Sequence, residues 1–179
     1  RLSSLQKSMV AGFNLSCVGD NRDYSIVESR YANTLADRVL KNVLHYHTDN
    51  KYSTYSFLKR GSDERQYNAP GVDLPVVGFC RSKFGEYPEY HTSADDLSLV
   101  SPEGLQGAYD VMKQVIDVLE MNQCYQIQVL CEPQLGKRGL YPTTSQKGSY
   151  DKVTAMVDFI AYADGKTDLI DISNKIGIP

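Results

Sequence analysis

Several features that would assign this chain to a functional class are absent from it. No apolar run approaches the roughly 18 to 20 residues that a helix needs to span a bilayer, and no signal peptide is visible. With a formal charge of -3 and a pI near 5.6, the chain lacks the excess of basic residues that is typical of nucleic-acid-binding domains. These absences predict a cytoplasmic globular protein that contacts neither membranes nor nucleic acid. The chain begins with Arg1 rather than Met, so we expect it to be a piece of a longer protein.

The four cysteines also lack the C-x-x-C spacing of common zinc and redox motifs. Cys17, Cys80 and Cys131 lie in or beside apolar runs, where a free cysteine behaves as a small hydrophobic residue. We therefore expect reduced structural thiols, with a disulfide or a metal-binding role as the alternatives.

What the sequence does contain is an alternation of strand-like and helix-like segments, which predicts an α/β fold. Strands are expected over 9–18, 51–58, 76–80 and 125–130, and helices over 34–47, 62–67, 102–119, 150–162 and 168–176. The long helix that begins at Ser101-Pro102-Glu103 has an apolar spacing that predicts its buried face. That face comprises Leu105, Ala108, Val111, Met112, Val115, Ile116 and Leu119.

Residues 132–149 are rich in Gly, Pro, Lys, Thr and Ser, which is typical of a linker or a long loop. This segment predicts two domains, 1–143 and 150–179. The last two helices are joined by a turn at Asp164-Gly165 and have the shape of a helix-turn-helix.

The loop that follows the buried strand at 76–80 carries the chemistry-bearing stretch Glu89-Tyr90-His91-Thr92-Ser93-Ala94-Asp95-Asp96. Ligands of open α/β sheets bind at the carboxyl ends of strands, so this loop is the candidate site. Taken by itself, His91 is either a structural residue or a metal ligand. Asp95 could orient its ring or merely cap the next turn. The acids Asp63 and Glu64 likewise either begin a helix or serve a function.

His45 and His47 lie two residues apart near the end of the helix predicted over 34–47, so they occupy different helix faces. We expect surface histidines there rather than a metal-binding pair.

The His91 stretch, followed by Leu99-Val100-Ser101-Pro102-Glu103-Gly104-Leu105, resembles the final metal-ligand segment of the co-catalytic zinc aminopeptidases. The upstream Gly61-Ser62-Asp63-Glu64-Arg65-Gln66-Tyr67 resembles their Ser-Asp segment, and the order of elements agrees. Nearly the whole chain is similar to the carboxyl-terminal part of bacterial aminopeptidase-like proteins with a trailing winged-helix domain. The resemblance implies part of a mixed, mostly parallel sheet flanked by helices, followed by a small winged helix-like segment.

By position, the resemblance implies that His91 is a zinc ligand with Asp95 behind it. The family has an aspartate ligand where this chain has Ser16-Cys17, so Asp20 is the nearest substitute. Tyr67 and Arg65 fall where a phenol or guanidinium could stabilise an oxyanion, and Asp63 and Glu64 fall in the substrate-binding segment. The implied substrates are peptides or small aminoacyl amides.

The family's first histidine, bridging aspartate and paired glutamates lie upstream of these motifs. The residues before Met9 contain no His, Asp or Glu, so this chain would hold only part of a centre for up to two zinc ions. In the complete family site, the two ions activate a water and a glutamate acts as the base.

Two other functions compete with the hydrolase hypothesis. One is an inactive binding or scaffold module on the same fold, and the other is a DNA-binding regulator built on the terminal helices. Asp164, Asp168 and Asp171 oppose phosphate contact, which favours an interaction or homo-oligomerisation module over DNA binding.

Overall fold

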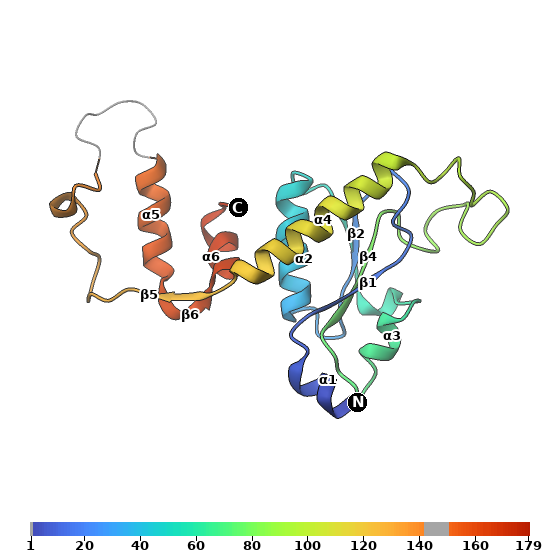
Figure 1. Cartoon of the computed structure of the whole chain (residues 1–179), viewed down its shortest axis with the longest axis horizontal. Coiled ribbons are helices and arrows are strands. Elements are labelled where there is room, and N and C mark those ends of the chain that lie inside the picture. Colours follow the sequence, from blue (N-terminus) through green and yellow to red (C-terminus); the bar gives the residue numbers. More distant parts are fainter. Residues whose placement is uncertain (1, 142–150) are drawn as a thin grey trace. The chain divides into compact units, whose positions relative to one another are not determined.

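A computed structural model describes residues 2–141 and 151–179 of the chain (Figure 1). Its contacts divide it into two compact units, Arg1–Leu119 and Glu120–Pro179. The sequence predicted a later domain boundary, between residues 143 and 150. That expected linker lies largely outside the described residues. The division is earlier because the strand after the long helix pairs with the C-terminal unit rather than with the first sheet.

The first unit is built on a four-stranded sheet with the order β1-β4-β2-β3. β1 (Gly12–Leu15) runs parallel to β4 (Val76–Cys80), and β2 (Ser25–Val27) runs parallel to β3 (Ser53–Tyr55). The pair β2–β4 is antiparallel. All residues of β2 and β4 are buried, as expected for apolar strands in the middle of a covered sheet.

The strand β2 was not expected from the sequence. Its segment is polar on both sides, and only Ile26 and Val27 are apolar. The strand forms because both its edges find partners, β3 on one side and β4 on the other. Tertiary pairing here overrides a weak local preference.

Helices flank this sheet (Figure 1). They are α1 (Leu2–Ser8), α2 (Leu35–His47), α3 (Glu64–Tyr67) and α4 (Pro102–Met121), with a short 3-10 turn, η1, at Phe57–Lys59. The predicted starts of α2 and α4 are confirmed, since Thr34 caps α2 and the hydroxyl of Ser101 accepts the Gly104 N–H at 3.0 Å. Among the described residues, no helix is long and apolar enough to cross a membrane.

The predicted buried face of α4 is only partly right. The helix buries Gly104, Ala108, Val111 and Val115, whereas Leu105 and Ile116 are 50% and 55% exposed. The apolar surface of this helix is therefore wider than the area that the sheet covers.

The second unit pairs β5 (Cys124–Gln126) with β6 (Asp164–Asp168) in an antiparallel ribbon. α5 (Asp151–Tyr162) and α6 (Leu169–Ile176) accompany it, with a short 3-10 turn, η2, at Gly136–Arg138. The carboxylate of Asp168 accepts the Asp171 N–H at 3.0 Å and caps α6, as the sequence predicts. The strand β6 was missed, because Asp164-Gly165 reads as a plain turn.

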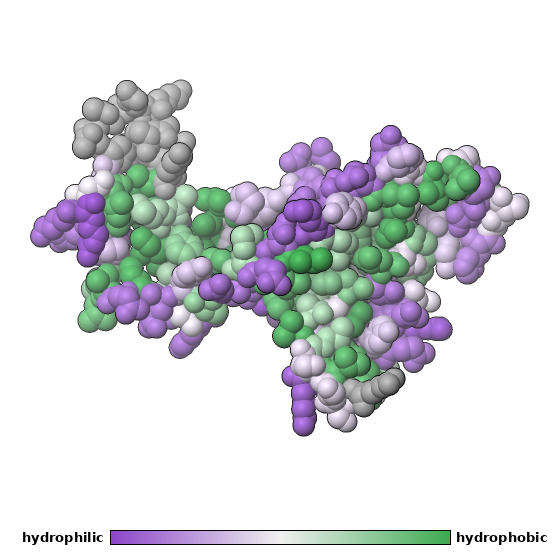
Figure 2. All heavy atoms as spheres, viewed as in Figure 1, coloured by the Kyte–Doolittle hydropathy of each residue, from purple (hydrophilic) through white to green (hydrophobic). Residues whose placement is uncertain are grey.

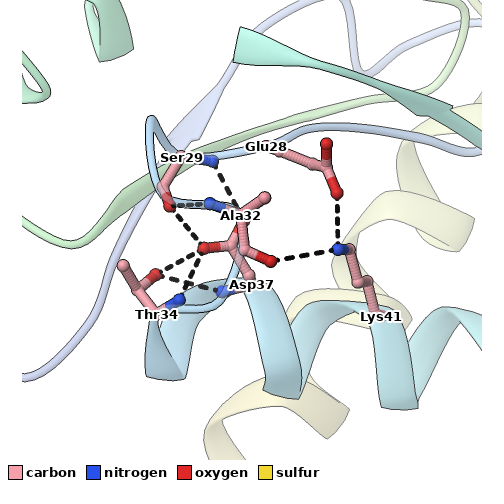
Figure 3. A network of polar contacts seen from close by, with 6 residues as sticks. All are labelled: Glu28, Ser29, Ala32, Thr34, Asp37 and Lys41. Atoms are coloured by element: carbon pink, nitrogen blue, oxygen red, sulfur yellow. Dashed lines mark hydrogen bonds and ion pairs between the residues drawn. The ribbon is translucent and has the colours of Figure 1, made fainter.

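A buried carboxylate holds the start of α2 (Figure 3). Asp37 is fully buried, and it accepts hydrogen bonds from the N–H and hydroxyl groups of both Ser29 and Thr34. These four hydrogen bonds help to offset the desolvation of the buried carboxylate. Nearby, Lys41 spans from its helix to Glu28 at 2.6 Å.

Replacing Asp37 by alanine leaves these donors buried without an acceptor. We expect a loss of about 3 kcal/mol in the free energy of unfolding, measured by urea denaturation. The matched control is Asp117→Ala, which removes an exposed ion pair with Lys113 and is expected to cost less than about 1 kcal/mol. Equal losses in the two variants would contradict the role of Asp37.

Candidate functional site

The candidate site lies where β1 and β4 end. Asp20 follows β1, and Ser82 follows β4. The Asp20 carboxylate is almost buried, with the residue 5% exposed. It accepts from the N–H groups of Arg22 (3.0 Å) and Ser82 (2.9 Å) and from the Ser82 hydroxyl (2.8 Å). An ionised carboxylate has about four acceptor positions, so one lone pair on Oδ2 is left for another ligand.

The beginning of α4 is pressed against this loop. Ser101 donates its N–H to the Gly19 carbonyl at 2.9 Å. A Cβ on Gly104 would lie 2.1 Å from that same carbonyl oxygen, so only glycine allows this approach. The sequence between β4 and α4 is thereby fixed at both ends, and the His91 loop is the part between them.

His91 itself is exposed and has a left-handed backbone with φ of 57°. Its ring stacks on Tyr90, with centroids 3.9 Å apart and planes at 17°. Neither ring nitrogen makes a hydrogen bond to the described part of the chain, so both are open to a ligand. Asp95 is also exposed, and in the part of the chain that the structure describes no hydrogen bond joins it to His91. Its role behind the histidine stays a prediction.

A bidentate ion pair ties the two loops together. Arg22 donates to both carboxylate oxygens of Glu89, at 3.0 and 2.8 Å. Arg22 lies two residues after Asp20, and Glu89 lies two residues before His91. The hydrogen bond to Arg22 lowers the pKa of Glu89 below its ordinary value. The pair therefore holds the loops that carry the two predicted ligands beside each other.

Tyr87 is a further member of this region that sequence reasoning missed. Burial, followed by its hydrogen bond with Cys17, raises the pKa of the Tyr87 phenol, and Asp95 and Asp20 add to the rise. Arg22, Ser82 and Glu89 were missed as well, because pairing between residues more than 60 positions apart has no local sequence signal.

The segment Gly61–Tyr67 splits into buried and exposed parts. Glu64 is fully buried, and it accepts from the Asn14 amide at 2.7 Å and from the N–H groups of Gly61 (2.9 Å) and Ser62 (3.1 Å). Asp63, Arg65 and Tyr67 are exposed. In the described chain, no hydrogen bond or ion pair joins this segment to Asp20 or His91. The substrate-binding and oxyanion roles of its residues stay predictions.

These donors do not amount to a metal centre by themselves. No group of three or more His, Cys, Asp or Glu residues that could hold a metal ion occurs within 2–141 and 151–179. Asp20 and His91 supply at most two donors, fewer than a tetrahedral zinc site takes.

The two histidine rings at the end of α2 contact other polar side chains. The ring of His45 contacts the Asn50 side chain at 3.1 Å, and that of His47 contacts Gln114 at 3.0 Å and Tyr24 at 3.4 Å. That they form no metal-binding pair stays a prediction.

All four cysteines are free. Cys80 is buried, and the expectation for it is confirmed. Cys17 is only partly buried, and Cys131 is exposed. Burial raises the pKa of the Cys80 thiol to about 12.

Family models match both parts of the chain. One described as a domain of unknown function, DUF4910, covers residues 1–122, and one described as a winged helix-turn-helix covers residues 122–179. The expected fold class, a mostly parallel sheet flanked by helices followed by a winged helix region, is confirmed by these matches together with the solved structures below.

Among characterised sequences, the chain is 36% identical over 174 residues to a Clostridium acetobutylicum protein. That protein is described provisionally as a polysaccharide biosynthesis protein with an aminopeptidase-like domain, and the match covers 96% of this chain and 40% of the relative.

Two solved structures are similar. A Clostridium acetobutylicum protein described provisionally as a peptidase has a TM-score of 0.83 at 33% identity, over 98% of this chain and 39% of that one. An aminopeptidase from Aneurinibacillus sp. strain AM-1 has a TM-score of 0.52 at 18% identity, over 65% of this chain and 28% of that one, which shows a shared fold. The chain thus spans about two fifths of the length of the Clostridium relatives that it matches.

The cysteine environments predict a clear order of thiol labelling. At about pH 8, a pKa near 12 leaves Cys80 with roughly a thousandfold less thiolate than an ordinary cysteine. We expect iodoacetamide to modify Cys124 and Cys131 first in the native protein, and Cys80 only after unfolding, as followed by peptide mass spectrometry. The unfolded protein is the control, since all four thiols should then react alike. Fast native labelling of Cys80 would contradict the structure.

The Arg22–Glu89 pair predicts a pH-dependent contribution to stability. The folded pKa of Glu89 is lowered, so the contribution is present above the unfolded pKa of about 4.3 and is lost as the pH falls through the folded pKa. Glu89→Gln should therefore be less stable than wild type at neutral pH and should converge with it in acid. Chemical denaturation between about pH 7 and pH 2 measures this. Glu132→Gln, at an exposed glutamate of the second unit, is the control. A difference that does not change with pH would contradict the pairing.

Proposed function

The chain belongs to the DUF4910 family through residues 1–122, and on this premise we propose that it is part of an aminopeptidase-like hydrolase of peptide or small amide bonds. The carrying observation is the juxtaposition, at the carboxyl ends of β1 and β4, of an Asp20 loop and a His91 loop that the Arg22–Glu89 pair joins. This is where open α/β sheets bind ligands. The names of the relatives and of the similar structures support the same function class.

We further propose that Asp20 and His91 each donate one atom to zinc. Asp20 has one unused lone pair on Oδ2, and His91 has two ring nitrogens without a partner in the described chain. Carboxylate oxygen and imidazole nitrogen are ordinary zinc ligands. Zinc bound there would supply Lewis acidity toward a carbonyl and a low-pKa water.

The donor set on this chain is incomplete, so no reaction step is assigned to a metal here. The missing ligands and the general base are proposed to come from residues outside this chain, which spans about two fifths of its relatives. The chain itself contributes by positioning the two proposed ligands, Asp20 and His91. The hydrogen bonds from Arg22 and Ser82 orient the Asp20 carboxylate, and the Tyr90 ring supports the face of His91. Contacts made behind a ligand in this way orient metal ligands in general.

A second candidate function is a binding module on the same fold without catalysis, which is favoured by Ser16-Cys17 at the position of the family's aspartate ligand. Among the described residues, no group of three or more candidate metal ligands occurs. The two functions differ in one measurable property, because a binding module would not turn over an amide even when it is loaded with zinc.

The test is the zinc content of the complete protein that carries this chain. We expect His91→Ala to lose one equivalent of zinc in elemental analysis, and Asp20→Asn to weaken zinc retention at least tenfold, as ligand losses typically do. His45→Ala is the matched control, since His45 is exposed and contacts Asn50 instead. Unchanged zinc in His91→Ala would reject the ligand assignment. A zinc-loaded protein that cleaves none of a panel of aminoacyl amides and short peptides would favour the binding module.

A further inference from the structure

Two cysteines of the first unit, Cys17 and Cys80, lie at the ends of neighbouring strands and have no part in the proposed zinc site. Cys17 follows β1 and is partly buried, whereas Cys80 is the last residue of β4 and is buried. The surface is a weaker guide than this pair, because apolar and polar residues are mixed on the face that Figure 2 shows, as is ordinary for proteins.

A β-bulge brings Cys17 opposite Cys80. The N–H of Ser16 donates to the Phe79 carbonyl at 3.1 Å, as the regular parallel partner of Cys80 should. The N–H of Arg81 then donates at 3.0 Å to the carbonyl of Cys17, where a regular ladder would use the carbonyl of Ser16. Two consecutive residues after β1 therefore oppose the single residue Cys80, which is the pattern of a β-bulge.

The bulge turns the Cys17 side chain towards the face of the sheet on which Cys80 lies. Side chains alternate between faces along a strand, so a regular strand would place Cys17 and Cys80 on opposite faces. Instead, the backbone of Cys17 is left-handed with φ of 51°, and its side chain packs against the buried cluster of Val27, Cys80 and Phe84. Neighbouring strands lie about 4.8 Å apart, and a disulfide joins Cα atoms about 4.4 to 6.8 Å apart. The two cysteines therefore have the backbone spacing that a disulfide needs.

We propose that Cys17 and Cys80 form a reversible disulfide bond under oxidising conditions, as a redox switch at the base of the candidate site. Cys17 lies three residues before Asp20, and Cys80 lies two residues before Ser82. The bond would join the strand ends from which both loops of the site start. In a reducing compartment such bonds are typically transient and redox-sensing, and the structure shows the reduced pair. The formation of this bond does not depend on the proposed function.

The oxidant in this proposal is a small disulfide such as oxidised glutathione. Cys17 is the more exposed thiol, so its thiolate attacks one glutathione sulfur, forms a mixed disulfide and releases the first glutathione. The Cys80 thiol then gives its proton to water and attacks the Cys17 sulfur, which releases the second glutathione. Two electrons and two protons pass in total from the two protein thiols to glutathione.

The second step is expected to be the slow one. Burial, to which the neighbouring Cys17 adds, raises the pKa of the Cys80 thiol to about 12. Few Cys80 thiolates are therefore present at neutral pH, and only a sulfur already held beside them can react in reasonable time. The mixed disulfide on Cys17 should appear first and then decay as the internal bond forms.

Oxidation of the full chain in glutathione buffers of increasing potential tests the proposal, with acid quenching, tryptic digestion without reduction and mass spectrometry. We expect one linked pair of peptides, Ser8–Arg22 with Gln66–Arg81, each of which contains a single cysteine. The link should lower the summed mass of the two peptides by about 2 Da, and dithiothreitol should reverse it. It should exceed any link to the exposed Cys124 or Cys131 about tenfold or more, because the fold holds the two thiols together.

Two variants and the unfolded chain are the controls. Cys80→Ala should stop at the mixed disulfide on Cys17, and Cys17→Ser should leave the buried Cys80 unmodified in the native protein. Circular dichroism of both reduced variants checks the fold. In urea, the Cys17–Cys80 link should lose its preference over links to Cys124 and Cys131. The proposal is overturned if native Cys17 stays unreacted or stops at the mixed disulfide in every buffer. Links that are as scrambled in the native chain as in urea overturn it too.

Discussion

All five residues of β4, Val76–Cys80, are buried, and this burial constrains everything around the strand. Buried backbone N–H and C=O groups must be hydrogen-bonded, so β4 needs a neighbour on each side. It has β1 on one edge and β2 on the other. Its two faces need cover, which flanking helices provide. The loops at its carboxyl end need neither neighbouring strands nor covering helices, so they can carry polar functional residues.

Those loops are held by polar contacts as well as by packing, since Phe84 belongs to a buried cluster with Val27 and Cys80, and Cys17 and Tyr90 pack against it. Asp20 gathers Arg22 and Ser82, and Arg22 reaches Glu89. The Asp20–Ser82 and Arg22–Glu89 links each join a residue after β1 to a residue after β4. The consequence is a surface where an oriented carboxylate and an open imidazole lie on loops that are tied to each other.

The same helix that closes the site also leaves an apolar row uncovered. α4 begins against Gly19 through Ser101 and Gly104, and its first apolar row is used up on the sheet. The orientation of the helix is thus set at its start, near the candidate site.

The sequence by itself determined the elements whose signals are local. The capping residue and proline before α4, the Thr34 cap of α2 and the apolar run of β4 each act within a few residues, so their elements were predictable. His91 could be singled out because a motif carries it, whereas Asp20 was chosen only as the acid nearest to Ser16-Cys17, where the family has its aspartate. Tertiary structure decided the rest. β2 exists because of its two neighbours, Glu64 is buried because Asn14 and the Gly61-Ser62 backbone meet it, and Arg22 finds Glu89 across 67 residues. Pairing across that distance depends on how the strands align, and no local pattern of residues contains it.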